Sequence, residues 1–203
     1  MRSAIAVVAV LTLGSVAGSA QEFEFGAKAG PSFGMLAFEP DEGGDYDRRA
    51  AADGGGFVVL PLAPRLAVQL EGLFTSKGGK LYDPEEDATG AILLQYFDLP
   101  VLLRVEGPRS LHFFGGPFAG IRLSAKRSVS SFVGSSRSGV KGDMSSEVER
   151  FEAGFLAGAG INLGRYVVID GRYIRGLTAL NTDRSDGLRV RNRGISFMAG
   201  VRF

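Results

Sequence analysis

Few residues in this chain could do chemistry. His112 is the only histidine, and an imidazole beside a serine hydroxyl can act as the general base of a hydrolase. Cysteine is absent, so the chain has no thiolate nucleophile, no disulfide and no cysteine-based metal site. A serine hydrolase site of the kind found in some outer-membrane lipid hydrolases would therefore have to use His112.

Glycine spacing offers a second candidate. The run Gly154-x-x-x-Gly158-x-Gly160 superficially resembles a phosphate-binding loop. It continues an alternating strand pattern, however, and it is followed by neither a helix nor the Lys-Ser or Lys-Thr pair that such a loop requires. We interpret these glycines as positions that let a strand bend and leave room for large side chains. The sequence predicts no cofactor.

Charged residues gather in the polar segments between apolar runs. Two acidic clusters offer carboxylate oxygens to calcium, but neither has the spacing of a dedicated calcium loop, so we expect solvated loop charge and no metal site. The clusters are Asp41, Glu42, Asp45 and Asp47, and Asp83, Glu85, Glu86 and Asp87. Near the C-terminus a group of arginines could pair with lipopolysaccharide phosphates, the alternative being a solvated loop. They are Arg184, Arg189, Arg191 and Arg193.

These residues lie on or between eight apolar runs, each of which has the alternation of a β-strand. The runs cover residues 23–36, 56–63, 66–77, 91–105, 110–124, 150–163, 166–177 and 194–203. The gaps alternate between long and short, which is typical of an eight-stranded antiparallel up-and-down transmembrane β-barrel with short periplasmic turns and long extracellular loops. The longest gap, 125–149, is rich in Ser and charge, and we expect a mobile loop there.

The two ends of the chain agree with export to an outer membrane. Arg2, the apolar run from Ala4 to Leu13 and the small residues up to Ala20 predict a signal peptide over 1–20, leaving a barrel domain over 21–203. The last ten residues have one apolar face and end on Phe203. This strand resembles the C-terminal signal that the barrel-assembly machinery reads in outer-membrane proteins.

If the apolar faces point to lipid, the charged residues between them point inward. Acids and bases are present there in comparable number, and eight strands leave an interior only wide enough for side chains. We therefore expect an ionic network that plugs the lumen, because unpaired buried charge is costly. Its members are Glu24, Lys28, Glu71, Asp98, Arg104, Arg122, Glu152, Asp170, Arg172 and Arg202.

Four short motifs carry a family resemblance. They are F-G-A-K-A-G-P-S-F-G (25–34), Y-F-D-L-P-V-L-L-R (96–104), F-G-G-P-F-A-G (114–120) and G-R-Y-I-R-G-L (171–177). In order and spacing they resemble the PorT family of outer-membrane beta-barrel domains, among the small OmpA-like and OmpX-like barrels. The resemblance implies an eight-stranded barrel whose best-known members assist a secretion system. It carries over no catalytic residue.

These observations predict an outer-membrane barrel that acts structurally or through its extracellular loops on a ligand or protein partner. Its other expected contacts are membrane lipid, lipopolysaccharide and the assembly machinery. The near balance of 23 Lys and Arg against 22 Asp and Glu argues against nucleic-acid binding. The rival predictions are a secreted lipocalin-like barrel around an apolar ligand and an outer-membrane lipid hydrolase. Charges on the second face argue against the lipocalin, and the place of His112 beside the short Gly107-Pro108 turn, away from the outer leaflet, argues against the hydrolase.

Overall fold

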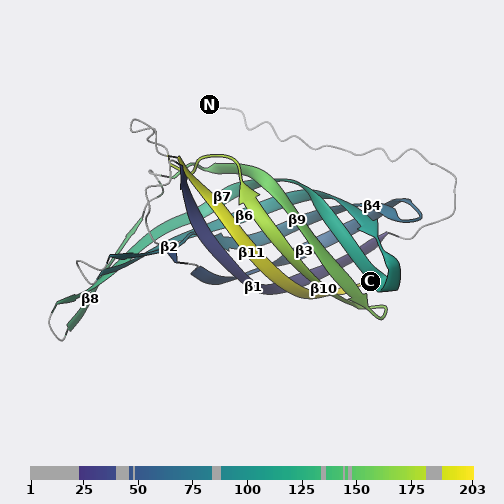
Figure 1. The fold of residues 1–203 in the computed structure, drawn as a ribbon, viewed down its shortest axis with the longest axis horizontal. Coiled ribbons are helices and arrows are strands. Elements are labelled where there is room, and N and C mark those ends of the chain that lie inside the picture. The colour runs from purple at the N-terminus through teal and green to yellow at the C-terminus, as the bar shows by residue number, and fades with distance from the viewer. Residues whose placement is uncertain are drawn as a thin grey trace, which may run out of the picture.

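The computed structural model describes residues 23–39, 46–47, 49–83, 88–133, 136–143, 145, 148–181 and 189–203. Eight strands form the wall of a closed antiparallel barrel. They are β1 (Glu24–Glu39), β3 (Arg49–Ala63), β4 (Leu66–Lys77), β6 (Ala88–Glu106), β7 (Leu111–Val133), β9 (Phe151–Leu163), β10 (Val167–Gly176) and β11 (Arg189–Arg202). Each strand pairs with the next in this order, and β11 pairs with β1 to close the ring (Figure 1). The predicted eight-stranded all-β barrel is confirmed.

The two ends of the barrel chain close the sheet on each other. The N–H of Phe25 donates to the carbonyl of Phe203 over 3.1 Å, and the N–H of Phe203 donates back over 2.8 Å. From there β1 and β11 stay in register up to the pair Glu39 and Arg189. A closed sheet has no free edge, which is the condition for strands to lie in lipid.

The strands alternate between a buried inner face and an exposed outer face. On β11 the outward Ile195, Phe197 and Val201 are exposed, whereas Ser196 and Met198 between them are buried. The other wall strands repeat the pattern, with large apolar side chains outside and charged or aromatic ones inside. This arrangement is the reverse of a soluble barrel and suits a lipid-facing wall. Among the residues that the structure describes, no helix has the length and apolar character to cross a membrane.

The two ends of the barrel differ in their connections. We call the end that carries Pro64-Arg65, the 3₁₀ turn Pro108–Ser110, Gly164 and Phe203 the turn end, and the opposite one the loop end. Three wall connections at the turn end need only a few residues, so the chain turns sharply there, with positive φ at Arg109, Ser110 and Gly164. The turns expected at these three positions are present.

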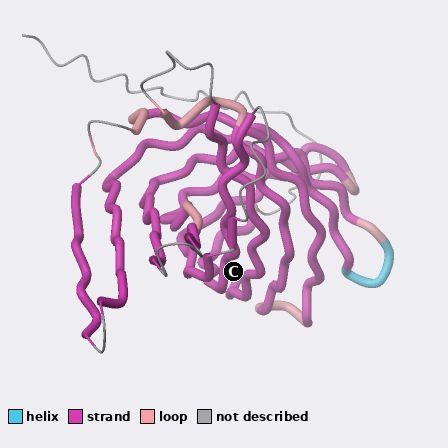
Figure 2. Tube along the Cα trace, turned by 60° about the vertical axis from the view of Figure 1, so that its left-hand side comes forward, coloured by secondary structure: helices cyan, strands magenta, loops and turns pink. Residues whose placement is uncertain are grey.

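Beyond the loop end the sheet continues as an extension, and the loop predicted over 125–149 is wrong in part. β7 runs on to Val133 and pairs with β8 (Ser136–Asp143), while β6 pairs with β5 (Lys80–Asp83), which in turn pairs with β2 (Tyr46–Asp47). The hairpin of β7 and β8 stands away from the wall (Figure 2). In the sequence, polar and serine-rich strands resemble loops. Strands beyond the membrane need no lipid-facing side, so apolar and polar residues do not alternate along them.

Three further boundaries were predicted too narrowly. β3 begins at Arg49, inside the predicted loop 37–55, and β6 and β11 begin at Ala88 and Arg189, inside the loops 76–90 and 178–193. In the first part of β3 the outward residues are Ala and Gly, which are too small to give a clear alternation of apolar and polar residues. The expected signal peptide 1–20 lies outside the described residues, as do Asp41, Glu42, Asp45, Glu85, Glu86, Asp87 and Arg184.

We predict that a charge in the middle of the outer wall destabilises the barrel. Phe197 is 53 % exposed, stands midway along the apolar outer face of β11 and covers Gly171 of β10. Phe197→Arg should lower the free energy of unfolding by about 2–4 kcal/mol in lipid vesicles, as measured by urea denaturation, because the guanidinium would face hydrocarbon. Ser145→Arg, at an exposed turn of the loop end, is the control and should be nearly silent. Equal effects at the two positions would contradict the lipid-facing assignment.

Candidate functional site

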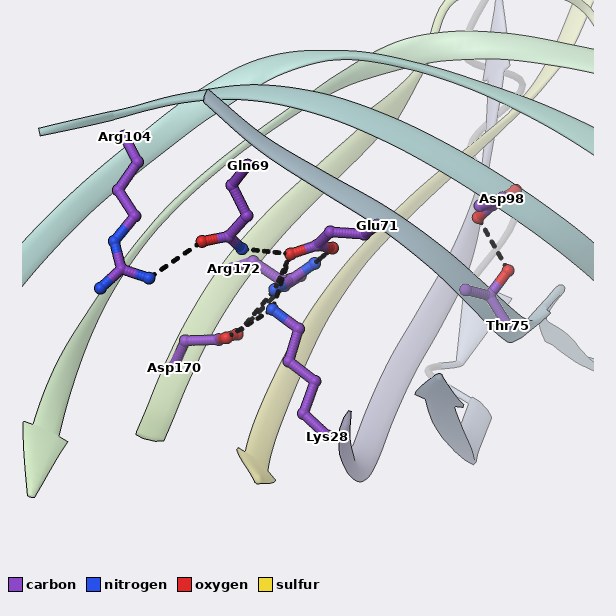
Figure 3. A network of polar contacts seen from close by, with 8 residues as sticks. All are labelled: Lys28, Gln69, Glu71, Thr75, Asp98, Arg104, Asp170 and Arg172. Atoms are coloured by element: carbon purple, nitrogen blue, oxygen red, sulfur yellow. Dashed lines mark hydrogen bonds and ion pairs between the residues drawn. The ribbon is translucent and has the colours of Figure 1, made fainter. Parts of the chain in front are cut away.

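Four charged side chains from three strands meet in the middle of the lumen. Lys28 of β1 bridges two carboxylates, with its Nζ 2.6 Å from Glu71 Oε1 and 2.9 Å from Asp170 Oδ2 (Figure 3). Arg172 binds the same pair, with Nη1 2.6 Å from Glu71 Oε2 and Nη2 2.9 Å from Asp170 Oδ1. All four side chains are at most 2 % exposed. The group is neutral, with two cations and two anions, and we call it the central quartet.

A chain of polar contacts continues from the quartet toward the turn end. The amide of Gln69 donates to Glu71 and its carbonyl accepts a 3.1 Å hydrogen bond from Arg104 Nη1. The Nε of Arg104 then binds Glu106 Oε1 over 2.7 Å. Arg104 is therefore buried between an amide and a partly exposed carboxylate. The polar path ends at the rim, where solvent can reach Glu106.

A second ionic group lies between the quartet and the loop end. Lys77 Nζ is 2.7 Å from Asp98 Oδ2 and 3.0 Å from Glu152 Oε2. Asp98 also accepts a 2.8 Å hydrogen bond from Thr75, and Glu152 accepts one of 3.1 Å from Asn192. One cation thus serves two carboxylates here, and neutral donors satisfy part of the remaining charge.

Asp53 is a further buried carboxylate near this second group. Its Oδ1 accepts hydrogen bonds of 2.9 Å from the hydroxyl of Ser32 and from the backbone N–H of Ser76. These contacts tie β3 to β1 and to β4. Asp53 and Lys77 were both missed as interior charges. Lys77 continues the inward alternation of Gln69, Glu71 and Thr75, which was the available signal, whereas Asp53 was hidden in a segment read as loop.

Aromatic rings separate the ionic groups. Phe114 lies against the quartet, with the Arg172 guanidinium 5.1 Å and Lys28 Nζ 5.9 Å from its centroid. Phe118 and Tyr96 flank Lys77, whose Nζ is 4.5 and 4.7 Å from their centroids. Cations over ring faces gain electrostatic stabilisation, more so when they are desolvated.

The glycines of the run 154–160 make room for these rings. Gly154, Gly158 and Gly160 of β9 are the cross-strand partners of Phe118, Phe114 and His112. A Cβ atom on any of the three would collide with the ring opposite. The glycine spacing that resembles a phosphate loop therefore serves close packing inside the barrel, as the sequence reading proposed.

An apolar cap covers the lumen at the loop end. Leu36, Leu94, Tyr96 and Ala125 from the wall pack with two residues of the connecting segments, Val148 and Leu180. Two hydrogen bonds hold these segments in place, from Glu149 N–H to the Leu180 carbonyl and from Leu180 N–H to the Val190 carbonyl. Tyr96 joins the cap to the second ionic group, because its ring also lies against Lys77 Nζ.

In the part of the chain that the structure describes, Arg122 makes its hydrogen bonds to a connecting segment and none to the carboxylates of the ionic network. Its guanidinium lies beside the cap and donates to two backbone carbonyls, over 3.2 Å to Glu149 and 2.8 Å to Ser145. The alternation of side chains along a strand predicts that Arg122 lies on the inner face, but it does not predict the position along the barrel axis. At its observed position Arg122 contacts the connecting segment and not the carboxylates of the network.

Glu24 and Arg202 form a pair at the turn-end rim. Arg202 Nη1 is 2.7 Å from Glu24 Oε1, and the two side chains are 15 % and 36 % exposed, so water screens this pair more than the quartet. His112 lies deeper, 1 % exposed and stacked on Phe114 at 5.9 Å. Among the described residues, no three His, Cys, Asp or Glu side chains gather as metal ligands would. The quartet is balanced in charge, whereas the second group has one cation for two carboxylates and Asp53 is bound by neutral donors.

The sequence matches the family described as outer membrane protein beta-barrel domain over residues 19–181. The chain belongs to this family. It is therefore an integral outer-membrane β-barrel, and the lipocalin alternative is not favoured, because the apolar face points outward and the ionic face inward.

Several solved structures of outer-membrane proteins are similar to this chain. Ail, the attachment invasion locus protein of Yersinia pestis, is 17 % identical with a TM-score of 0.52, over 90 % of this chain and 99 % of that one. Neisserial surface protein A is 14 % identical with a TM-score of 0.43, over 89 % and 97 %. The outer-membrane protease OmpT of Escherichia coli is 12 % identical with a TM-score of 0.37, over 91 % and 97 %. At 17 % identity the likeness to Ail concerns the fold alone. A comparison with curated protein sequences gives no significant match.

We predict that breaking the quartet costs far more than breaking the rim pair. Arg172→Met leaves Glu71 and Asp170 with Lys28 as their shared cation and should lower the free energy of unfolding in lipid vesicles by about 3–5 kcal/mol. Arg202→Met is the matched control at the partly exposed rim and should cost at most about 1 kcal/mol. A quartet variant as stable as the rim variant would show that the buried pairs do not hold the wall strands together.

Proposed function

We propose that this protein is a closed, non-enzymatic barrel that acts structurally in the outer membrane or binds a ligand or protein partner at its loop end. The observation that carries the proposal is the plugged lumen. The ionic residues Lys28, Glu71, Asp170 and Arg172 span the interior between β1, β4 and β10, and the apolar cap lies above them. An interior filled in this way serves the fold and leaves the rims and the outer wall for binding.

The extension at the loop end supports a binding role there. β7 and β8 pair from Lys126 with Asp143 to Val133 with Ser136, so this part of the chain is a structured hairpin beyond the wall. A lipid-spanning strand needs about 9–11 residues, and β7 has 23. The surplus length has no use in crossing the membrane, which favours a role outside it.

The absence of enzymatic activity is part of the proposal. His112 is buried toward the turn end, where it stacks on the ring of Phe114 and lies against Gly160 of the partner strand. A buried imidazole with such neighbours is poorly placed to activate a serine for attack on lipid.

The resemblance to the PorT family and the assembly signal at the C-terminus are also part of the proposal. The PorT resemblance is supported by motif residues that face the lumen, Asp98, Arg104, Phe114 and Arg172, and the exposed terminal ring of Phe203 remains the predicted signal for the assembly machinery.

The plug predicts that the purified barrel is not a general porin. In a planar lipid bilayer it should show no steady large conductance, whereas a general porin inserted in parallel should conduct. The measurement is single-channel current at fixed voltage. Steady porin-like channels from the wild-type protein would overturn the closed-lumen proposal.

Cysteine labelling tests whether the loop end faces the outside of the cell. The chain has no native cysteine, so introduced thiols are read without background. In intact cells a membrane-impermeant maleimide should label Ser145→Cys at the loop end and should reach Arg165→Cys at the turn end only after lysis. Both positions are exposed, so accessibility within the fold is matched. The reverse labelling pattern would place the extension in the periplasm.

A further inference from the structure

Arginines gather on the outer face of the wall where β10 and β11 approach the loop end. Arg175 and Arg193 are direct cross-strand partners, and Arg191 and Arg189 follow on the same face of β11. Asn192, between Arg191 and Arg193, is buried in the lumen, which places these two arginines on the opposite face. We call Arg175, Arg189, Arg191 and Arg193 the wall arginines.

No acid neighbours the pair Arg175 and Arg193 on the flanking strands. In the same row, Arg175 pairs with Phe155 of β9 and Arg193 pairs with Met35 of β1. The diagonal positions on those strands are Ala153, Ala157, Phe33 and Ala37. Like charges directly opposite each other destabilise a sheet. An anion between the two guanidinium groups would remove this cost.

The surface next to the pair, toward the turn end, is apolar. Tyr173 and Ile195 form the next outward cross-strand pair and Phe197 follows, with 47 %, 38 % and 53 % of these residues exposed. On β11 the apolar outer face ends at Arg193, because Arg191 and Arg189 follow, whereas just after β10 the exposed Leu177 follows Arg175. Basic residues at such an edge of an apolar face are suited to anionic lipid headgroups. A soluble anion would gain nothing from the apolar surface, whereas a lipid uses both parts.

We propose that Arg175 and Arg193 bind a phosphate of an outer-leaflet glycolipid of the lipid A type, whose acyl chains lie along Tyr173, Ile195 and Phe197. A guanidinium binds a phosphate with two parallel hydrogen bonds, so two opposed arginines enclose one phosphate group. Arg191 and Arg189 follow on the same face of β11, where Glu39 of β1 is the direct cross-strand partner of Arg189, so the proposed phosphate site is the pair Arg175 and Arg193. Choice of the outer leaflet rests on the proposed outward orientation of the loop end.

The test is lipid A binding in maltoside micelles, which contain no phosphate, with bound lipid counted by native mass spectrometry. Wild-type protein should bind lipid A, and the double variant Arg175→Gln/Arg193→Gln should bind it roughly 25-fold more weakly, since each basic residue near an anionic lipid contributes about fivefold. The matched control is Arg65→Gln/Arg165→Gln, which removes two exposed arginines at the turn end and should bind as wild type does. Equal affinity of the two double variants would overturn the proposal.

Two further measurements keep the test independent of folding and of orientation. Without lipid, the Arg175→Gln/Arg193→Gln variant should melt no lower than wild type, because a repulsion has been removed, and lipid A should raise the melting temperature of wild type only. Phosphate-stripped lipid A and phosphatidylglycerol should each fail to give this rise, and a rise with either would overturn the assignment to a glycolipid phosphate. Micelles have no leaflets, so this assay can succeed even where cysteine labelling contradicts the proposed orientation.

Discussion

Lipid hydrocarbon offers no hydrogen-bond partner to a peptide group, and the other features of this barrel follow from that constraint. Strands can lie in such a medium only when the sheet has no free edge, and the mutual hydrogen bonds of Phe25 and Phe203 close it. Closure gives each strand one lipid face and one lumen face. The lipid face must then be apolar, so the charged side chains of the wall either point inward or lie at the ends of the strands.

Inward charges share a narrow space with little water, which favours ion pairs and hydrogen bonds between them. Burial of an unpaired ion costs several kcal/mol in a protein, whereas matched ions with added hydrogen bonds can offset their desolvation. The central quartet meets this condition with residues from β1, β4 and β10, strands that are not neighbours in the wall. Its contacts therefore fix the relative position of strands across the lumen, which hydrogen bonds between adjacent strands cannot do. Rings such as Phe114 and Phe118 fill the space between the ionic groups.

The arrangement of an apolar outer face and a filled interior limits where a partner can bind. The interior is occupied by paired charges, rings and the cap, so binding is left to the loop end and the outer wall. Both depart from the minimum that a spanning barrel needs. β6 and β7 continue as an extension, and the pair Arg175 and Arg193 places two cations side by side on the outer face. A feature that costs stability or chain length without serving the wall is a reasonable place to look for a partner.

The sequence by itself determined the number of wall strands and the face on which each side chain of a strand lies, because period-2 alternation is a local property of extended backbone. It also placed Lys28, Glu71, Asp170 and Arg172 inside. Only the tertiary structure decided which charges meet, because that depends on the stagger between strands far apart in the chain. The stagger brings Lys77 to Glu152 and leaves Arg122 at the connecting segments. It also sets Gly158 opposite Phe114, so glycines whose spacing resembles that of a phosphate loop make room for an aromatic ring. Strands outside the lipid, such as β8, have no apolar face, so the residue pattern of the sequence could not distinguish them from loops.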